Sequence, residues 1–222
     1  MKIYESLEQG TEEWLEVRKG KITGSMLPKL ISSKTLKVLT GETANSVLSG
    51  VVASKSVLVA EDILIPQFIN GHTGEGLAKR KYQKKFNKSV KEVGFLESDC
   101  GRYGMSPDGL VGDEGFIEIK TMSVNIYTTS VLEDGEPALY GTSNYYMQIL
   151  MGFIVNPNFK WCDFVMYNLS MDEATNFKVI RIERNEEHIE IVKKVLENEI
   201  LPKLNEMENK FMEKFNITNL DI

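Results

Sequence analysis

The stretch that decides the fold reads SPDGL at residues 106–110 and, after a short link, FIEIK at residues 116–120. Side chains two apart on a strand point to the same face, so Glu118 and Lys120 emerge together while the isoleucines face an apolar side. A turn within the link lets the first piece fold back toward the second, which brings Asp108 close to Glu118. We therefore expect two carboxylates and one ammonium at one point, an arrangement that binds a hard divalent metal through oxygen.

Each half of this stretch also has an ordinary explanation. Pro107-Asp108-Gly109 is strong turn chemistry, and a Glu-X-Lys pair occurs by chance on many exposed strands. The apolar residues of the second half, however, predict a buried strand, where stray charges are costly. Taken together, the two halves favour a metal site over a turn and a chance pair.

A third carboxylate is expected near this pair. On a helix predicted from Gly71 to Phe86, Glu75 begins a stripe that continues through Ala78 and Tyr82. The other members of the stripe are core-type residues, which places the acid at the edge of the surface that the helix covers. The alternative is that Glu75 is simply an acid in the favourable first turn of a helix.

Polar residues elsewhere could bind phosphate. Trp14 and Arg18 lie one helical turn apart, and Thr23 and Ser25 lie at the start of the next predicted helix. A surface stack of arginine on tryptophan is the plain interpretation. The functional one is a guanidinium that binds phosphate beside a helix N-terminus rich in hydroxyls. Gln148 has strongly apolar neighbours, so a buried, hydrogen-bonded role fits it.

The composition is that of one soluble globular domain covering residues 1–222. The chain is 42% hydrophobic and 26% charged, and no run approaches the length of a membrane span. Only two cysteines occur, which fits a reducing cytoplasm and excludes an iron–sulfur cluster held by four thiolates. Two histidines are too few for a histidine metal cage, and no Walker-type loop occurs.

The net charge of −6 argues against a protein that coats nucleic acid nonspecifically. It does not exclude a nuclease, since acidic metal ligands lower the formal charge and bound ions reverse its local sign. The basic residues, however, form one cluster in the chain. Such a cluster either contacts phosphate or forms a solvated helix face, and both interpretations stay open. Its members are Lys79, Arg80, Lys81, Lys84, Lys85, Lys88 and Lys91.

The periodicity predicts an α/β or α+β domain in which a small mixed sheet is flanked by helices. Nothing in the chain resembles a repeat or a linker, so one domain is the simplest account. Helices are expected over residues 8–19, 24–31, 42–64, 71–86, 144–154 and 185–215, the last interrupted near Pro202. Strands are expected over residues 90–97, 102–105, 109–112, 116–121, 160–168 and 177–183.

These motifs, taken in chain order, resemble one known family, that of phage lambda exonuclease and the YqaJ-type viral recombinases. The family belongs to the PD-(D/E)XK nuclease superfamily, so the resemblance implies a restriction-endonuclease-like core. The chain departs from lambda exonuclease over residues 34–68 and 147–150, which concern strand separation and trimer contacts. The motifs that carry the resemblance are Gln9-Gly10, Trp14, the run from Arg18 to Ser25, Gly74-Glu75, residues 106–110, Glu118-Ile119-Lys120 and Tyr146-Met147-Gln148.

The resemblance implies a Mg²⁺-dependent 5′-to-3′ exonuclease, with Mn²⁺ as a substitute and two ions in each active site. Such an enzyme hydrolyses one strand of linear double-stranded DNA from its end and leaves a 3′ single-stranded overhang for recombination by strand annealing. The resemblance also implies a homotrimer ring around the DNA and a single-strand annealing protein as partner. It implies no membrane association, and a phage or prophage product in the cytoplasm of a bacterial host.

Carried over by position, the resemblance assigns roles to particular residues. Metal ligation falls to Asp108, Glu118, the Ile119 carbonyl and Glu75. Lys120 and Gln148 would orient or activate the attacking water. The polar residues assigned to the 5′-terminal phosphate are Arg18, Thr23, Ser25 and Ser106, and the residue assigned to an apolar wedge that splays the duplex is Phe68.

Two alternatives stay open beside the exonuclease. One is another PD-(D/E)XK endonuclease, which would cut closed circular DNA. The other is a catalytically silent module that binds DNA ends. The intact set of Asp108, Glu118 and Lys120 weighs against the silent module, because a decayed site usually loses a charge.

Overall fold

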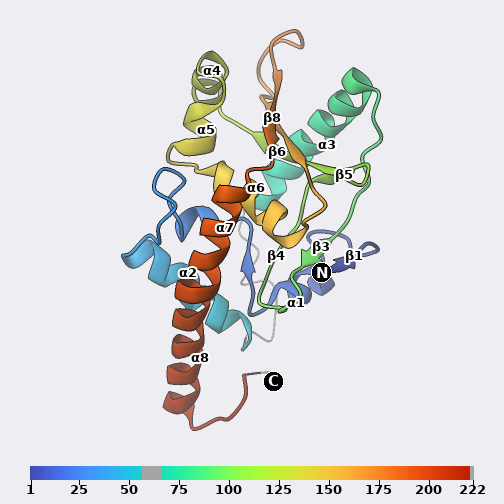
Figure 1. Ribbon diagram of the computed structural model, residues 1–222. Coiled ribbons are helices and arrows are strands. Elements are labelled where there is room, and N and C mark those ends of the chain that lie inside the picture. The colour runs from blue at the N-terminus through green and yellow to red at the C-terminus, as the bar shows by residue number, and fades with distance from the viewer. Residues whose placement is uncertain (57–66, 221–222) are drawn as a thin grey trace.

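The structure, a computed structural model, describes residues 1–56 and 67–220, and for residues 67–73 it describes the backbone alone (Figure 1). The fold class predicted from the sequence is confirmed, since helices pack around small mixed sheets. The strands are β1 Lys2–Tyr4, β2 Ile22–Thr23, β3 Phe95–Glu97, β4 Tyr103–Met105, β5 Gly109–Val111, β6 Gly115–Thr121, β7 Trp161–Tyr167 and β8 Phe177–Glu183. The helical elements are α1 Glu12–Arg18, η1 Leu27–Lys29, α2 Glu42–Ser54, α3 Gln67–Phe86, α4 Val124–Leu132, α5 Glu136–Tyr140, α6 Tyr145–Val155, α7 Glu186–Val195, η3 Leu196–Ile200 and α8 Leu201–Phe215.

The single sheet expected from the sequence is instead two four-stranded sheets. The first has the strand order β1-β3-β4-β2 and the second has the order β5-β6-β7-β8. The chain passes from the first to the second between Met105 and Gly109. Pro107 lies at this crossing, and a proline has no N–H with which to continue a strand ladder.

The second sheet places the FIEIK segment at its centre. β6 pairs antiparallel with β5 and parallel with β7, so that Glu118 lies opposite Phe164. A parallel pair needs a long crossover, which α4, α5 and α6 supply between β6 and β7. β8 then closes the edge by pairing antiparallel with β7.

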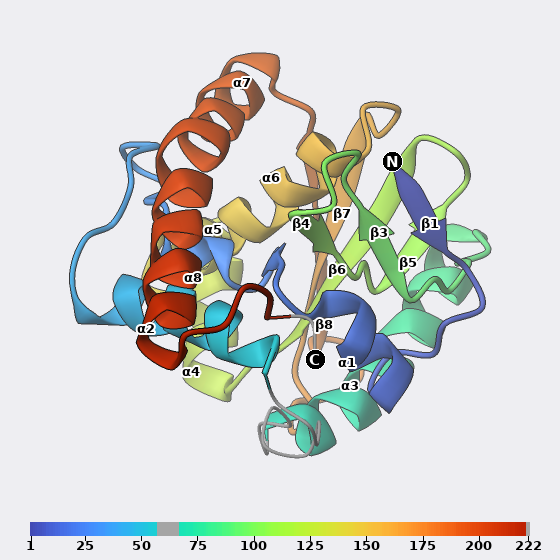
Figure 2. The same cartoon turned by 90° about the horizontal axis from the view of Figure 1, so that it is seen from below.

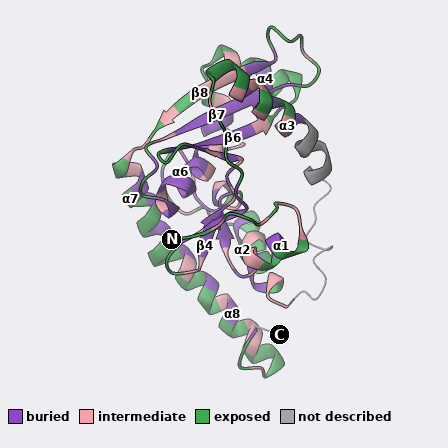
Figure 3. Cartoon of the chain, turned by 90° about the vertical axis from the view of Figure 1, so that its right-hand side faces the viewer, coloured by how far each residue is buried: buried purple, intermediate pink, exposed green. Residues whose placement is uncertain are grey.

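The two faces of β6 meet different helices. Phe116 packs edge-on against Phe153 of α6, with ring centroids 5.5 Å apart. The two isoleucines of β6 pack instead in a cluster with Ala78 and Tyr82 of α3. Figure 1 and Figure 3 place α3 and α6 on opposite sides of this sheet. The alternation predicted for the strand is therefore present, but a helix covers each face.

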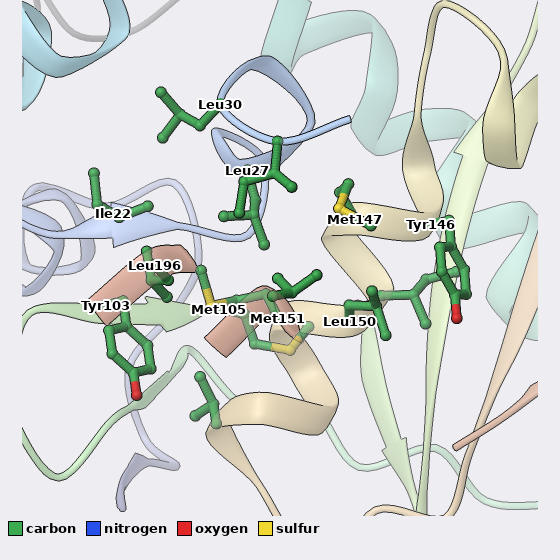
Figure 4. Packing of buried hydrophobic residues seen from close by; sticks show 14 of the residues in the cluster. Ile22, Leu27, Leu30, Tyr103, Met105, Tyr146, Met147, Leu150, Met151 and Leu196 are labelled. Carbon is green, nitrogen blue, oxygen red and sulfur yellow. The ribbon is translucent and has the colours of Figure 1, made fainter. Parts of the chain in front are cut away.

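The larger core joins the first sheet to α6 and to the C-terminal helices. Figure 4 shows Ile22 of β2, Met105 of β4, Met151 of α6 and Leu196 of η3 gathered in it. The exposed fraction of each of these residues is 0% or 1%. Burial of this apolar surface holds the first sheet against the helix that carries Gln148.

The expected break near Pro202 is instead a change of helix type. α7 runs into the π-helical turn η3, and α8 begins at Leu201. Proline cannot donate to the preceding turn and its ring crowds the carbonyl four residues earlier. A wider turn before Pro202 accommodates the ring, and the three elements continue as one long rod (Figure 1).

Several other boundaries differ from prediction. The strand expected over 90–97 is confined to β3 in the first sheet, because Lys91 instead forms an isolated bridge with Leu110 of the second sheet. The helix expected over 24–31 is only the short 3₁₀ turn η1, and α2 ends at Ser54, with residues 57–66 outside the described part. No element is predicted for residues 124–140, which form α4 and α5.

A search of the described helices finds none with both the length and the apolar character to cross a membrane.

A buried carboxylate ties the C-terminal rod to the rest of the fold. Glu208 of α8 lies 3.1 Å from the ammonium of Lys55 and 3.0 Å from the guanidinium of Arg102. Lys55 follows α2, which lies beside α8 (Figure 2). Removing the carboxylate leaves two partly buried cations close together.

We expect Glu208→Ala to lower the free energy of unfolding by about 2 kcal/mol, because it breaks a buried ion pair without removing the partner charges. Urea denaturation measures the change. Glu206→Ala is the matched control, since Glu206 pairs with Lys210 on the exposed face of the same helix and should cost less than about 1 kcal/mol. Equal losses for the two variants would contradict an anchoring role for Glu208.

Candidate active site

The β5–β6 hairpin brings the two halves of the 106–120 stretch together. Its antiparallel register pairs Gly109 with Ile117, which places Asp108, immediately before β5, beside the middle of β6. The Asp108 carboxylate accepts a 2.5 Å hydrogen bond from the backbone N–H of Ile119. The convergence expected from the sequence is therefore present, with Asp108 beside the segment that carries Glu118 and Lys120.

Glu118 is fully buried, and only one of its two oxygens is satisfied. Oε1 accepts a 2.6 Å hydrogen bond from the Gln148 amide and lies 2.5 Å from the Lys120 ammonium. Oε2 is buried and has no hydrogen-bond partner among the described residues. Burial raises the pKa of Glu118 to about 8, Lys120 opposes the rise, and the charge of Asp108 adds to it. A cation at Oε2 would satisfy an oxygen that the described residues leave unmatched.

Lys120 remains an ammonium at this site. Burial acts to lower the pKa of Lys120, but the neighbouring carboxylates Glu118 and Asp108 outweigh it, so the net shift is upward. Its Nζ also lies 5.0 Å from the ring centroid of Tyr145. A lysine held in this way acts as a fixed positive charge and not as a free base.

Glu75 joins the group because α3 approaches β6 unusually closely. A Cβ added to Gly74 would lie 2.5 Å from the Thr121 hydroxyl, so the glycine allows this spacing without moving the Thr121 side chain. Burial raises the pKa of the half-buried Glu75 to about 7, and the charge of Asp108 adds to the rise. Three carboxylates therefore lie near one another: Glu75 on α3, Asp108 in the loop before β5, and Glu118 on β6.

The basic run on α3 is only partly free to contact phosphate. Lys79 lies 2.8 Å from Glu92 and 3.6 Å from Glu75. Lys81 donates to the Asn176 side chain and to a backbone carbonyl of the β7–β8 loop. The remaining members of the run on the helix, Arg80, Lys84 and Lys85, are exposed.

Arg18, the last residue of α1, lines the same cavity as Glu75 and Asp108. Its guanidinium stacks on the Trp14 ring, 3.8 Å from the centroid, and reaches the Thr23 hydroxyl at 3.4 Å. Nε of Arg18 is buried without a hydrogen-bond partner in the described part of the chain. Burial alone lowers the pKa of Arg18 to about 10. A partly desolvated guanidinium of this kind favours an anionic ligand.

The phosphate-binding residues predicted from the sequence lie together around Arg18. The Thr23 and Ser25 hydroxyls are 3.2 Å apart, and the Ser106 hydroxyl accepts a 2.9 Å hydrogen bond from the Trp14 indole. One cavity of about 410 Å³ is lined both by these residues around Arg18 and by the residues around Asp108. Its lining residues include Trp14, Arg18, Thr23, Ser25, Ser106, Glu75, Asp108, Ile119, Lys120 and Gln148.

Two residues of the site have roles that the sequence did not indicate. The Gln9 amide donates 2.9 Å hydrogen bonds to the carbonyls of Val93 and Pro107, which fixes the backbone before Asp108. Tyr145 lines the cavity next to Lys120. Gln9 belongs to the Gln9-Gly10 motif that carries the resemblance, and Tyr145 belongs to an apolar run, but no local pattern indicates either contact.

The predicted metal ligands are brought together, but their role stays a prediction. As the described side chains are placed, no group of three or more His, Cys, Asp or Glu could hold a metal ion. The donors nevertheless fit Mg²⁺, which prefers carboxylate oxygens, and the unmatched Oε2 of Glu118 supports the fit. The side chain of Phe68, the predicted wedge, lies outside the described part.

The fold is that of the alkaline exonucleases. The crystal structure of an alkaline exonuclease, LHK-Exo from Laribacter hongkongensis, matches with a TM-score of 0.78 and 23% identity over 93% of this chain and 98% of that chain. The structure of LHK-Exo in complex with dAMP gives 0.75 and 24% with the same coverage. A phage-related exonuclease from Haemophilus somnus 129PT gives 0.65 and 12% over 88% and 96% of the two chains.

The family model for the YqaJ-like viral recombinase domain matches residues 13–156. The chain therefore belongs to the YqaJ-like viral recombinase family, and the resemblance carried by its motifs is confirmed. A comparison with curated proteins gives no match.

We expect Arg18→Ala to impair the use of 5′-phosphorylated DNA ends. Loss of a charge-assisted contact to phosphate should raise KM about tenfold or more, with little change in kcat. Steady-state assays on duplexes that differ only in a 5′-phosphate or a 5′-hydroxyl measure the effect. An equal loss on both ends would argue against a phosphate pocket at Arg18.

Proposed function

We propose that the protein is a Mg²⁺-dependent exonuclease that degrades one strand of linear double-stranded DNA from its 5′ end. The observation that carries the proposal is a single cavity with two oppositely charged walls. Glu75, Asp108 and Lys120 line one side, with Glu118 buried against Lys120, and Arg18 with its hydroxyl neighbours lines the other. A phosphodiester chain needs both, because the cleaved phosphate requires metal and the neighbouring phosphate requires a fixed cation.

The carboxylates of Asp108, Glu118 and Glu75, with the Ile119 carbonyl, would hold Mg²⁺ or Mn²⁺, two ions in each site. When bound, the metal supplies Lewis-acid polarisation of the phosphoryl oxygen and favours ionisation of the attacking water. Among the described residues that line the cavity, none is a histidine or cysteine that would select a softer metal.

The residues of the chain itself supply orientation and charge. Lys120 places an ammonium where negative charge builds up on the phosphate during in-line displacement, and stabilises it. Gln148 holds Glu118 through its amide. Arg18, Thr23, Ser25 and Ser106 bind the 5′-terminal phosphate and so place the first phosphodiester over the carboxylates.

The biological role that we propose is recombination. The 3′ single-stranded overhang left by such an enzyme would be used by a single-strand annealing protein of a phage or prophage in the bacterial cytoplasm. A homotrimer ring around the DNA is the assembly that fits this role. Membership of the viral recombinase family supports this proposal.

A comparison of matched linear and closed circular duplexes, with and without Mg²⁺, tests the activity. We expect nucleotides to be released only from the linear duplex and only when Mg²⁺ is present. A label at the 5′ end of a strand should be released before a label at its 3′ end. Cleavage of the circle would favour an endonuclease of the same superfamily. Binding to linear ends without any hydrolysis would favour the silent end-binding module.

We expect Lys120→Ala to keep the fold and DNA binding but to lower kcat by about 10²–10³, because a fixed charge that stabilises the transition state is lost. Single-turnover rates and a gel-shift assay measure the two properties. The matched control is Lys178→Ala, a half-buried strand lysine on β8 outside the cavity. Cleavage by the Lys120 variant at the wild-type rate would show that the assigned role is wrong.

A further inference from the structure

A second buried carboxylate lies behind the active site, between the sheet and α3. Asp163 of β7 is 3% exposed, although it occupies the middle of a strand in the core. Arg181 of β8 donates to both of its oxygens, at 2.7 and 2.8 Å. The hydroxyl of Tyr82, a fully buried residue of α3, donates to Oδ2 at 2.6 Å.

Burying a charge at this position costs free energy that apolar side chains would not. Well-packed apolar residues of similar volume are often as stabilising as a buried ion pair. On β6, α3 packs through an apolar cluster that joins Ala78 to Ile117 and Ile119, and Lys81 reaches the β7–β8 loop beyond the sheet. Apolar packing resists separation but fixes rotation only weakly, whereas a hydrogen bond is directional. The Tyr82–Asp163 bond therefore supplies a constraint that the apolar cluster lacks.

Tyr82 lies on the same stripe of α3 as Glu75. Seven residues separate them, which corresponds to about two helical turns and about 10 Å along the axis. Gly74, next to Glu75, lets this end of the helix lie close to Thr121, because a Cβ there would come within 2.5 Å of the Thr121 hydroxyl. The Tyr82–Asp163 hydrogen bond is the directional contact on the other side of Glu75.

The helix needs such a restraint because its acid is repelled. Glu75 is half-buried and faces the charge of Asp108, with only Lys79 and Lys120 to offset it. Without a bound cation, rotation of α3 would carry Glu75 away from the other carboxylates and relieve the repulsion. A site prearranged for a cation must resist that rotation.

We propose that the Tyr82–Asp163 hydrogen bond positions Glu75: it fixes the rotation of α3 against the sheet, so that Tyr82 and Asp163 govern how tightly the carboxylates take up a divalent cation. The inference rests on the proposed function in one respect, that Glu75 is a metal ligand. Tyr82 and Asp163 are positioning residues, since neither lines the cavity.

Tyr82→Phe tests the proposal, because it removes the hydroxyl but keeps the ring and leaves Asp163 paired with Arg181. Calorimetric titration of the DNA-free protein with MnCl₂ or MgCl₂ measures cation affinity directly. We expect the dissociation constant to rise about tenfold, the usual effect of losing a group that orients a metal ligand. We expect the Mg²⁺ concentration for half-maximal nuclease activity to rise in parallel, with kcat at saturating Mg²⁺ largely retained.

Tyr103→Phe is the matched control. Tyr103 is also a buried tyrosine whose hydroxyl donates to a carboxylate, Glu197, at 2.9 Å, but this bond leads to the C-terminal rod. The two variants should lose similar thermal stability, and only Tyr82→Phe should weaken cation binding. Unchanged affinity in Tyr82→Phe, or an equal loss in both variants, would overturn the positioning role.

A third variant separates this inference from the proposed function. Glu75→Gln should weaken cation binding if Glu75 is a ligand. If Glu75→Gln weakens binding and Tyr82→Phe does not, only the positioning role fails. If Glu75→Gln binds the cation as the wild type does, the ligand set proposed above is wrong and the positioning role fails with it.

Discussion

A carboxylate with no exposed surface, Glu118, is the constraint on which the rest of the site depends. Burying an ion costs several kcal/mol unless opposite charge and hydrogen bonds compensate for it. Lys120 and Gln148 satisfy one oxygen, and the other is unmatched within the described residues. The fold thus holds a carboxyl group whose ionised form a further cation would stabilise.

The elements around Glu118 are rigid for a related reason. Asp108 and Glu75 carry the same charge as Glu118, and each raises the pKa of that carboxyl. Carboxylates that repel one another stay close together only where the surrounding backbone holds them in position. The hydrogen bond from the Ile119 N–H restrains Asp108, and the glycine at position 74 allows α3 to lie close to Thr121 at the end of β6. Across the cavity, Arg18 rests on Trp14, which places positive charge opposite the acids.

The central part of this arrangement could be predicted from the sequence, and the rest could not. Period-two alternation in FIEIK gave the strand, its two faces and the pairing of Glu118 with Lys120, and turn chemistry gave the approach of Asp108. The stripe on α3 gave Tyr82 as a core residue, but its hydroxyl partner lies 81 positions away, where no local pattern reaches. The two-residue strand β2 and the split into two sheets were missed because such short strands show no periodicity.

The most direct test of the account is the location of a bound ion. Crystals soaked in Mn²⁺ would reveal it by anomalous scattering, without any assumption about activity. We predict a peak in contact with both Asp108 and Oε2 of Glu118, with Lys120 still within ion-pair distance of Oε1. A peak elsewhere, or a saturating soak that leaves these carboxylates without an ion, would contradict the account.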